Sequence, residues 1–122
     1  MSRAAVTGVL LMLLPGAAGA ADIAAGKAVF QRCLICQTIK AGAGSKVGPD
    51  LHGIFGRKAG SADHFAYSEA MRASGIVWND ETLSRFLGNP RKAIPGNRMA
   101  FPGIKDDMDL TNLLAYLHQA AQ

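Results

Sequence analysis

Two cysteines carry the clearest potential for chemistry: Cys33 and Cys36 form a C-x-x-C sequence followed by Gln37. Such a pair can act as a redox dithiol, half of a zinc site, a short disulfide or a haem-attachment site. A redox dithiol of the thioredoxin type should follow a strand in a βαβ unit, which this sequence does not predict. A zinc site needs two further ligands, and the spacing of His52 and His64 fits no common zinc finger. Haem attachment expects a histidine directly after the pair, where this chain has Gln37. The motif alone leaves these interpretations open.

The chain that must position this pair is long enough for one small domain, with 122 residues. Hydrophobic residues make up 49% and charged residues 18%, which excludes an intrinsically disordered chain. Two cysteines are too few for a disulfide-dense miniprotein. With only 7% aromatic residues, but 14 glycines, the side chains supply a thin core for so much loop. Something other than side chains must complete the core.

The first twenty residues have the pattern of a secretory signal peptide. Arg3 precedes an apolar run over residues 4–14, and small residues lead to an A-x-A site with cleavage after Ala20. The run is shorter than the roughly 20 residues of a membrane span. Cleavage would leave a mature domain of residues 21–122 with 12 basic and 9 acidic side chains, a formal charge of +3. The signal predicts an oxidising compartment, the bacterial periplasm.

Helix signals in the mature chain are separated by two long irregular segments. Glycines punctuate residues 40–60, and prolines and glycines interrupt residues 91–103, so both are predicted as loops. The predicted helices run from the N-cap Asp22 towards Cys33, over residues 68–73, from Asn79 or Asp80 to Gly88, and from Asp106 or Asp107 through Leu110, Leu113, Leu114 and Leu117. No strand signal is strong, which predicts an all-α domain.

A series of short motifs around the cysteines resembles the class I cytochromes c, closest to bacterial, mitochondrial-like members. In chain order these motifs are Gly26-Lys27 with Phe30, Cys33 and Cys36; Val47-Gly48-Pro49-x-Leu51-His52-Gly53; Phe65-x-Tyr67-Ser68; Gly75-Ile76-x-Trp78; Leu87-x-Asn89-Pro90; Ile94-Pro95-Gly96-x-x-Met99-x-Phe101; and Leu113-x-Ala115-Tyr116-Leu117. They cover nearly the whole mature chain. The resemblance implies a small all-α cytochrome c fold, with helices and long loops wrapped around one covalent haem c that supplies the missing core.

The resemblance also implies which residues hold the haem and its iron. Cys33 and Cys36 would form thioether bonds to the haem vinyl groups. Met99 would be an axial ligand, because a soft thioether suits ferrous iron and raises the reduction potential. Phe101, two residues further on, would contact the haem.

Four further residues match positions that orient or neutralise the haem in the family. Tyr67 and Trp78 would donate hydrogen bonds to a haem propionate, and Arg57 would offset the propionate charge. Pro49 matches a proline whose carbonyl accepts the N–H of the proximal histidine. All four contacts are implied by the resemblance.

Gln37 is the departure from the family pattern, since it occupies the place of the proximal histidine. A glutamine amide is a weak donor to iron, which leaves three hypotheses: an electron carrier with atypical axial ligation, a peroxidase-like or gas-binding haem protein with an open iron site, or a haem-free relic that acts as an interaction protein. We favour the carrier, which is not an enzyme, because the rest of the pattern is intact. Replacement by another histidine is not expected: His52 is interpreted as a structural loop residue and His118 as solvent-facing, and His64 has no assigned role.

Seven basic residues occupy positions that ring the exposed haem edge in the family: Lys27, Arg32, Lys46, Arg91, Lys92, Arg98 and Lys105. The resemblance implies that this face docks on acidic surfaces of membrane-bound or periplasmic reductases and oxidases. Asp106, Asp107 and Asp109 dilute the ring at one margin. A charge of +3 without a basic-aromatic motif excludes nucleic acid as a partner, and we expect a monomer.

Overall fold

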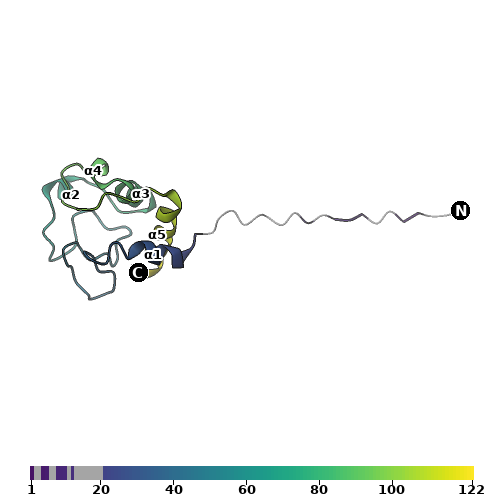
Figure 1. Cartoon of the computed structure of the whole chain (residues 1–122), viewed down its shortest axis with the longest axis horizontal. Coiled ribbons are helices and arrows are strands. Elements are labelled where there is room, and N and C mark those ends of the chain that lie inside the picture. The colour runs from purple at the N-terminus through teal and green to yellow at the C-terminus, as the bar shows by residue number, and fades with distance from the viewer. Residues whose placement is uncertain (2–3, 6–7, 11, 13–20) are drawn as a thin grey trace.

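In a computed structural model, the described part of the chain contains five helices joined by long irregular segments (Figure 1). The structure describes residues 1, 4–5, 8–10, 12 and 21–122, so most of the predicted signal peptide and its cleavage site lie outside the described residues. The helices are α1 (Ile23–Phe30), α2 (Glu69–Ala73), α3 (Asp80–Gly88), α4 (Pro90–Ala93) and α5 (Asp107–Ala120). Among these described residues, β pairing is limited to an isolated bridge between Lys58 and Val77. The observed architecture is all-α, as predicted.

Polar side chains begin the helices where the sequence predicts them. The N-caps of α1, α2, α3 and α5 are Asp22, Ser68, Asn79 and Asp106, respectively. Each side chain accepts a hydrogen bond from a backbone N–H of the first turn, which satisfies a donor that the helix itself leaves unpaired. Within the described part of the chain, no helix is long and apolar enough to cross a membrane.

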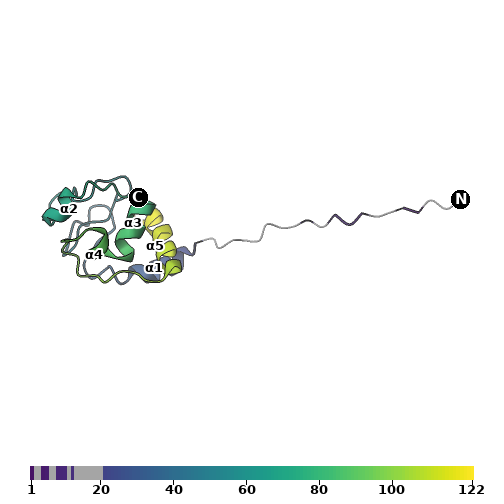
Figure 2. The same ribbon diagram turned by 90° about the horizontal axis from the view of Figure 1, so that it is seen from above.

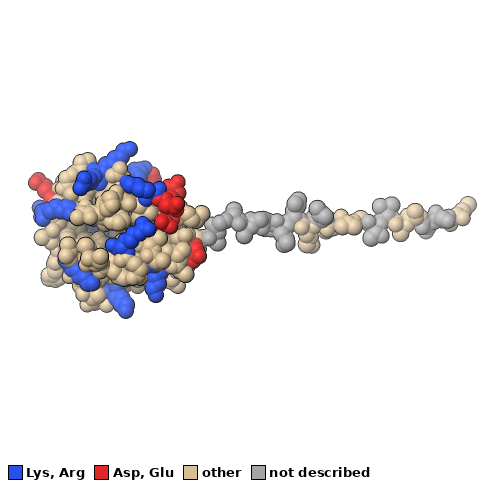
Figure 3. All heavy atoms as spheres, in the orientation of Figure 1, with Lys and Arg blue, Asp and Glu red and all other residues tan. Residues whose placement is uncertain are grey.

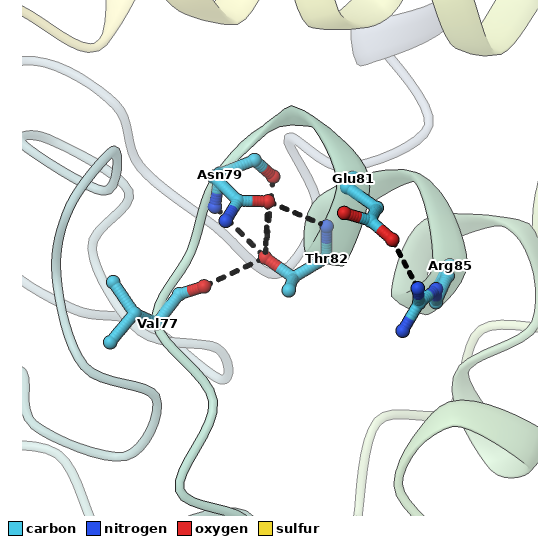
Figure 4. A network of polar contacts seen from close by, with 5 residues as sticks. All are labelled: Val77, Asn79, Glu81, Thr82 and Arg85. Carbon is cyan, nitrogen blue, oxygen red and sulfur yellow. Dashed lines mark hydrogen bonds and ion pairs between the residues drawn. The ribbon is translucent and has the colours of Figure 1, made fainter.

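The cap of α3 is reinforced by a reciprocal pair of hydrogen bonds (Figure 4). The Asn79 side chain accepts from the Thr82 N–H at 2.9 Å, and the Thr82 hydroxyl accepts from the Asn79 N–H at 2.8 Å. The same hydroxyl donates to the Val77 carbonyl at 2.8 Å, and Glu81 and Arg85 form an ion pair one turn along the helix. This capping box fixes the direction in which the chain leaves Trp78 and enters α3.

Two helix predictions are wrong in detail. Helix α1 ends at Phe30, because the following N–H groups bond three residues back and tighten the chain into turns; the Cys33 N–H donates to the Phe30 carbonyl at 2.8 Å. The predicted loop over residues 91–103 begins with α4. There Asn89 is an N-cap that accepts from the Lys92 N–H at 3.3 Å, and proline at the first helical position starts a new turn.

The body is held together where α1 crosses α5, and the two helices lie side by side in both views (Figures 1 and 2). Phe30 and Leu113 are each only 1% exposed at this crossing. The Phe30 and Tyr116 rings pack at a centroid distance of 5.4 Å. A Cβ on Gly26 would lie 1.9 Å from the Asn112 carbonyl oxygen, so the helices meet at a distance that only glycine permits.

The long segment between α1 and α2 is tied back to the body through the chain on either side of Trp78. The Trp78 carbonyl accepts from the Gly56 N–H at 2.8 Å, and the Trp78 N–H donates to the Arg57 carbonyl at 2.9 Å. The Ala59 N–H donates to the Ile76 carbonyl at 2.8 Å. These bonds give the irregular segment a defined path and place Trp78, which is 5% exposed, in the interior.

Candidate functional site

A cavity of about 400 Å³ with mostly apolar walls lies between the helices and the two long segments. It is lined by all nine residues predicted for the site: Cys33, Cys36, Gln37, Pro49, Arg57, Tyr67, Trp78, Met99 and Phe101. Phe86, Leu83 and Leu113 add apolar surface from α3 and α5. A cavity of this volume with a few convergent polar groups is typical of a small-molecule or cofactor site.

The two cysteines line this cavity but differ in solvent exposure. Both are free thiols; Cys33 is buried, whereas Cys36 is exposed. Burial raises the pKa of the Cys33 thiol to about 11, although the nearby Arg32 charge opposes this shift. Redox-active dithiols need a lowered thiol pKa, and the described residues contain no group of three or more metal-ligating side chains for a zinc site. Of the four interpretations of the motif, attachment of a cavity-bound cofactor fits best.

Met99 reaches the cavity from the segment after α4, where Asn97 fixes the backbone. The Asn97 amide donates to the carbonyls of Pro90 and Ile94, each at 2.8 Å, and its oxygen accepts from the Met99 N–H at 2.9 Å. Sequence reasoning missed Asn97. The available signal was an asparagine two residues before the methionine, because asparagine side chains close turns onto the second following N–H.

Tyr67 and Trp78 are buried aromatic residues of the cavity wall. The Tyr67 hydroxyl oxygen accepts from the Ala62 N–H at 3.2 Å, which leaves its own O–H free to donate. Burial raises the pKa of Tyr67, opposed by the Ala62 N–H and by the Arg57 charge, so the phenol is neutral near pH 7. The Trp78 ring packs against Phe86 at a centroid distance of 5.2 Å. Both residues therefore combine an apolar surface with one hydrogen-bond donor.

The guanidinium groups of Arg32, Arg57 and Arg98 border the same cavity. Arg57 donates to the carbonyls of His52 and Asp50 at 3.0 and 2.8 Å, so it fastens the long loop as well as contributing positive charge. Arg98 donates to the Tyr67 carbonyl at 3.3 Å. Together they provide a positive environment for carboxylates of a bound cofactor.

Gln37 enters the cavity directly after the cysteine pair. Its backbone N–H donates to the Cys33 carbonyl at 2.9 Å, and its half-buried side chain lies against Gly48. A Cβ on Gly48 would lie 2.7 Å from Gln37 Cγ and 3.0 Å from Nε2, so the missing side chain makes room for the glutamine. The Gly48 N–H donates to the Cys36 carbonyl at 2.6 Å and holds the two segments together ahead of Pro49.

These features fit a haem. The apolar walls suit its ring, the two thiols suit its vinyl groups, the Met99 thioether suits its iron, and the donors and guanidinium groups suit its carboxylates. Residues 23–121 match the family model described as Cytochrome c. The chain belongs to the cytochrome c family.

Individual cytochromes c bear out this assignment. The chain is 45% identical over 102 residues to cytochrome c2 of Blastochloris viridis, which covers 84% of this chain and 80% of that protein. It is 48% identical over 99 residues to cytochrome c of Cochliobolus lunatus, covering 80% of this chain and 92% of that one. The solved structure of cytochrome cH from Methylobacterium extorquens superposes with a TM-score of 0.76 at 39% identity, covering 80% of this chain and 98% of that structure.

Family membership establishes the coarse function of the chain. Cytochromes c bind one covalent haem c and carry electrons, so haem c is the cofactor of this chain and electron transfer its role, rather than enzymatic turnover. The carrier hypothesis is therefore the one supported among the three raised by Gln37. The predicted cytochrome c fold is confirmed as well.

Proposed function

We propose that this chain is a periplasmic single-electron carrier whose haem c is attached through Cys33 and Cys36, with Met99 as its one strong side-chain ligand and Gln37 in the place of the second. The supporting observation is that all nine predicted side chains, drawn from segments far apart in the sequence, line one cavity. When bound, the haem supplies a one-electron ferric/ferrous couple.

Different residues of the cavity would hold the haem and set its reduction potential. The Met99 thioether favours ferrous iron, and the Asn97 hydrogen bonds keep its loop in place. Phe86 and Leu83 exclude water, which raises the cost of the extra charge on ferric iron. Tyr67 and Trp78 would donate hydrogen bonds to a haem propionate, as the free Tyr67 O–H permits, and the guanidinium groups would offset the propionate charge.

The basic side chains suit a partner with an acidic face. All seven predicted ring residues are exposed, and Lys and Arg are spread across the face in Figure 3, whereas most of its acidic side chains gather at one edge. Arg32 and Arg98 also line the cavity, so positive charge lies next to the site of electron transfer. Arg32 is partly neutralised by Asp109, 3.8 Å away. We expect charge to speed encounter with reductases and oxidases more than to stabilise the complex.

The periplasmic location rests on the sequence of residues 1–20. Their basic, apolar and small-residue order is that of a cleaved signal, and α1 begins at Ile23, two residues after the predicted mature N-terminus. We therefore propose a mature domain of residues 21–122. N-terminal sequencing of the protein from a periplasmic extract tests this division, which predicts Ala21 as the first residue.

A potentiometric titration of the purified holoprotein tests the carrier function. The expected result is one reversible couple with a slope for a single electron, retained over repeated cycles. In a matched double variant, Cys33→Ala with Cys36→Ala, the haem would no longer be covalently held. This variant should lose its haem on denaturing chromatography, and the couple with it. Irreversible bleaching, or the absence of any couple in the unaltered protein, would contradict the proposal.

A further inference from the structure

The chain's three histidines lie away from the cavity, and all three are described in the structure. His118 Nε2 lies 2.6 Å from a carboxylate oxygen of Asp80, and its ring stacks on Phe55 at 3.7 Å. His52 is half-buried in the loop that Arg57 fastens, and His64 is exposed in a turn with a φ of 57°. The protein therefore has no imidazole of its own to offer where Gln37 stands.

The methionine thioethers of the cavity come from a different part of the chain than Gln37. Met71 lies on α2, and α2 packs against the Met99 segment: a Cβ on Gly96 would lie 3.3 Å from the Ala70 Cβ. The two methionines thus come from neighbouring segments, whereas Gln37 belongs to the segment held by Gly48. Among the cavity-lining residues of that segment, Cys33 and Cys36 are assigned to the haem vinyl groups, which leaves the Gln37 amide, a poor ligand for haem iron.

The Gln37 side chain is also lightly restrained. No hydrogen bond among the described residues engages its amide, and its Cγ and Nε2 are accommodated only because Gly48 lacks a side chain. A flexible side chain without a fixed partner can turn aside at little cost, in contrast to Arg57 or Asn97, whose polar groups are each bound twice or more.

From this arrangement we infer that the Gln37 side of the cavity binds a small neutral nitrogen donor of the imidazole class, which completes the ligand set of the iron while Met99 stays bound. The lone pair of the donor nitrogen would supply the coordinate bond, and Gln37 can move aside without breaking a hydrogen bond. This inference rests on the proposed function, because it requires the haem to be attached.

Titration of the ferric holoprotein with imidazole, followed by its visible spectrum and by electron paramagnetic resonance, tests the inference. Saturable conversion from high spin to low spin is expected, with half-saturation at an imidazole concentration at least about tenfold below that of Gln37→His, in which imidazole must displace a side chain. Gln37→Ala should bind at least as tightly as the unaltered protein. The iron-shifted NMR signals of the Met99 methyl group should persist in the imidazole complex.

Two glycine variants provide a matched control. Gly48→Ala places a methyl group 2.7 Å from Gln37 Cγ and should shift the imidazole affinity, whereas Gly88→Ala, with its nearest neighbour 3.9 Å away, should leave the affinity unchanged. The inference is overturned if imidazole binds no better than to Gln37→His, or if binding removes the Met99 signals. An absent covalent haem would instead defeat the proposed function, so the two failures can be distinguished.

Discussion

The crossing of α1 and α5 gives the sharpest stability prediction, because Gly26→Ala introduces a defined clash. The added Cβ would lie 1.9 Å from the Asn112 carbonyl oxygen, 2.5 Å from its carbon and 3.0 Å from the Tyr116 Cβ. Two of these atoms belong to backbone, so the helices must separate. Separation also strains the hydrogen bond from the Asp22 N–H to the Asn112 side chain, which is 2.8 Å long.

The expected magnitude follows from three contributions. Overpacking against backbone costs about 3 kcal/mol, and the weakened, partly buried hydrogen bond adds about 1 kcal/mol. The better helix propensity of alanine returns about 1 kcal/mol. The free energy of unfolding of Gly26→Ala should therefore fall by about 3 kcal/mol, which lowers Tm by roughly 15 °C in a domain of this size.

Denaturation of the holoprotein by guanidinium chloride, followed by far-UV circular dichroism, measures this loss. Gly88→Ala serves as the control, since its added Cβ has no neighbour closer than 3.9 Å, and the stability of this variant should not fall. If both variants unfold at the same denaturant concentration, the account of close helix contact at Gly26 is wrong.

Three further predictions concern single side chains. Asn97→Ala removes three hydrogen bonds around the Met99 loop, so denaturant unfolding should show a loss of about 2 kcal/mol, and the Met99 methyl signals should broaden; unchanged signals would contradict its positioning role. Asn79→Ala breaks the capping box with Thr82 and should lower the free energy of unfolding by about 1 kcal/mol in the same assay. A variant as stable as the unaltered protein would show that this cap does not stabilise the fold. Burial raises the pKa of Tyr67, so folding favours its neutral form. The stability of the unaltered protein relative to Tyr67→Phe should therefore be constant below about pH 10 and fall at higher pH, and a relative stability that rises there would refute this sign.

Local signals in the sequence predicted much of the fold. Asp22 is predicted as the N-cap of α1, and the starts of the other three helices are predicted to within one residue, at Ser68, at Asn79 or Asp80, and at Asp106 or Asp107. These starts can be predicted because capping depends on side chains within three residues of the helix start. The sequence pattern does not predict α4, because a proline after Asn89 indicates the end of α3, although proline also favours the first turn of a new helix.

Contacts between distant segments could not be predicted in the same way. His118 is exposed, as expected, but its pairing with Asp80 joins residues 38 positions apart, and no local pattern encodes that contact. Cys33, Cys36 and Gln37 stand out by their spacing, and the other six residues predicted for the site come from the family resemblance. The structure brings all nine to one cavity. Their individual roles towards the haem remain predictions, as does the ligand role of Gln37.

The intact mass of the mature protein, measured under denaturing conditions after purification from the periplasm, tests the central claim most directly. We predict a mass equal to residues 21–122 plus one haem, with the haem retained because Cys33 and Cys36 hold it covalently. A mass equal to the bare mature chain would contradict the assignment of these two cysteines and of the electron-carrying function.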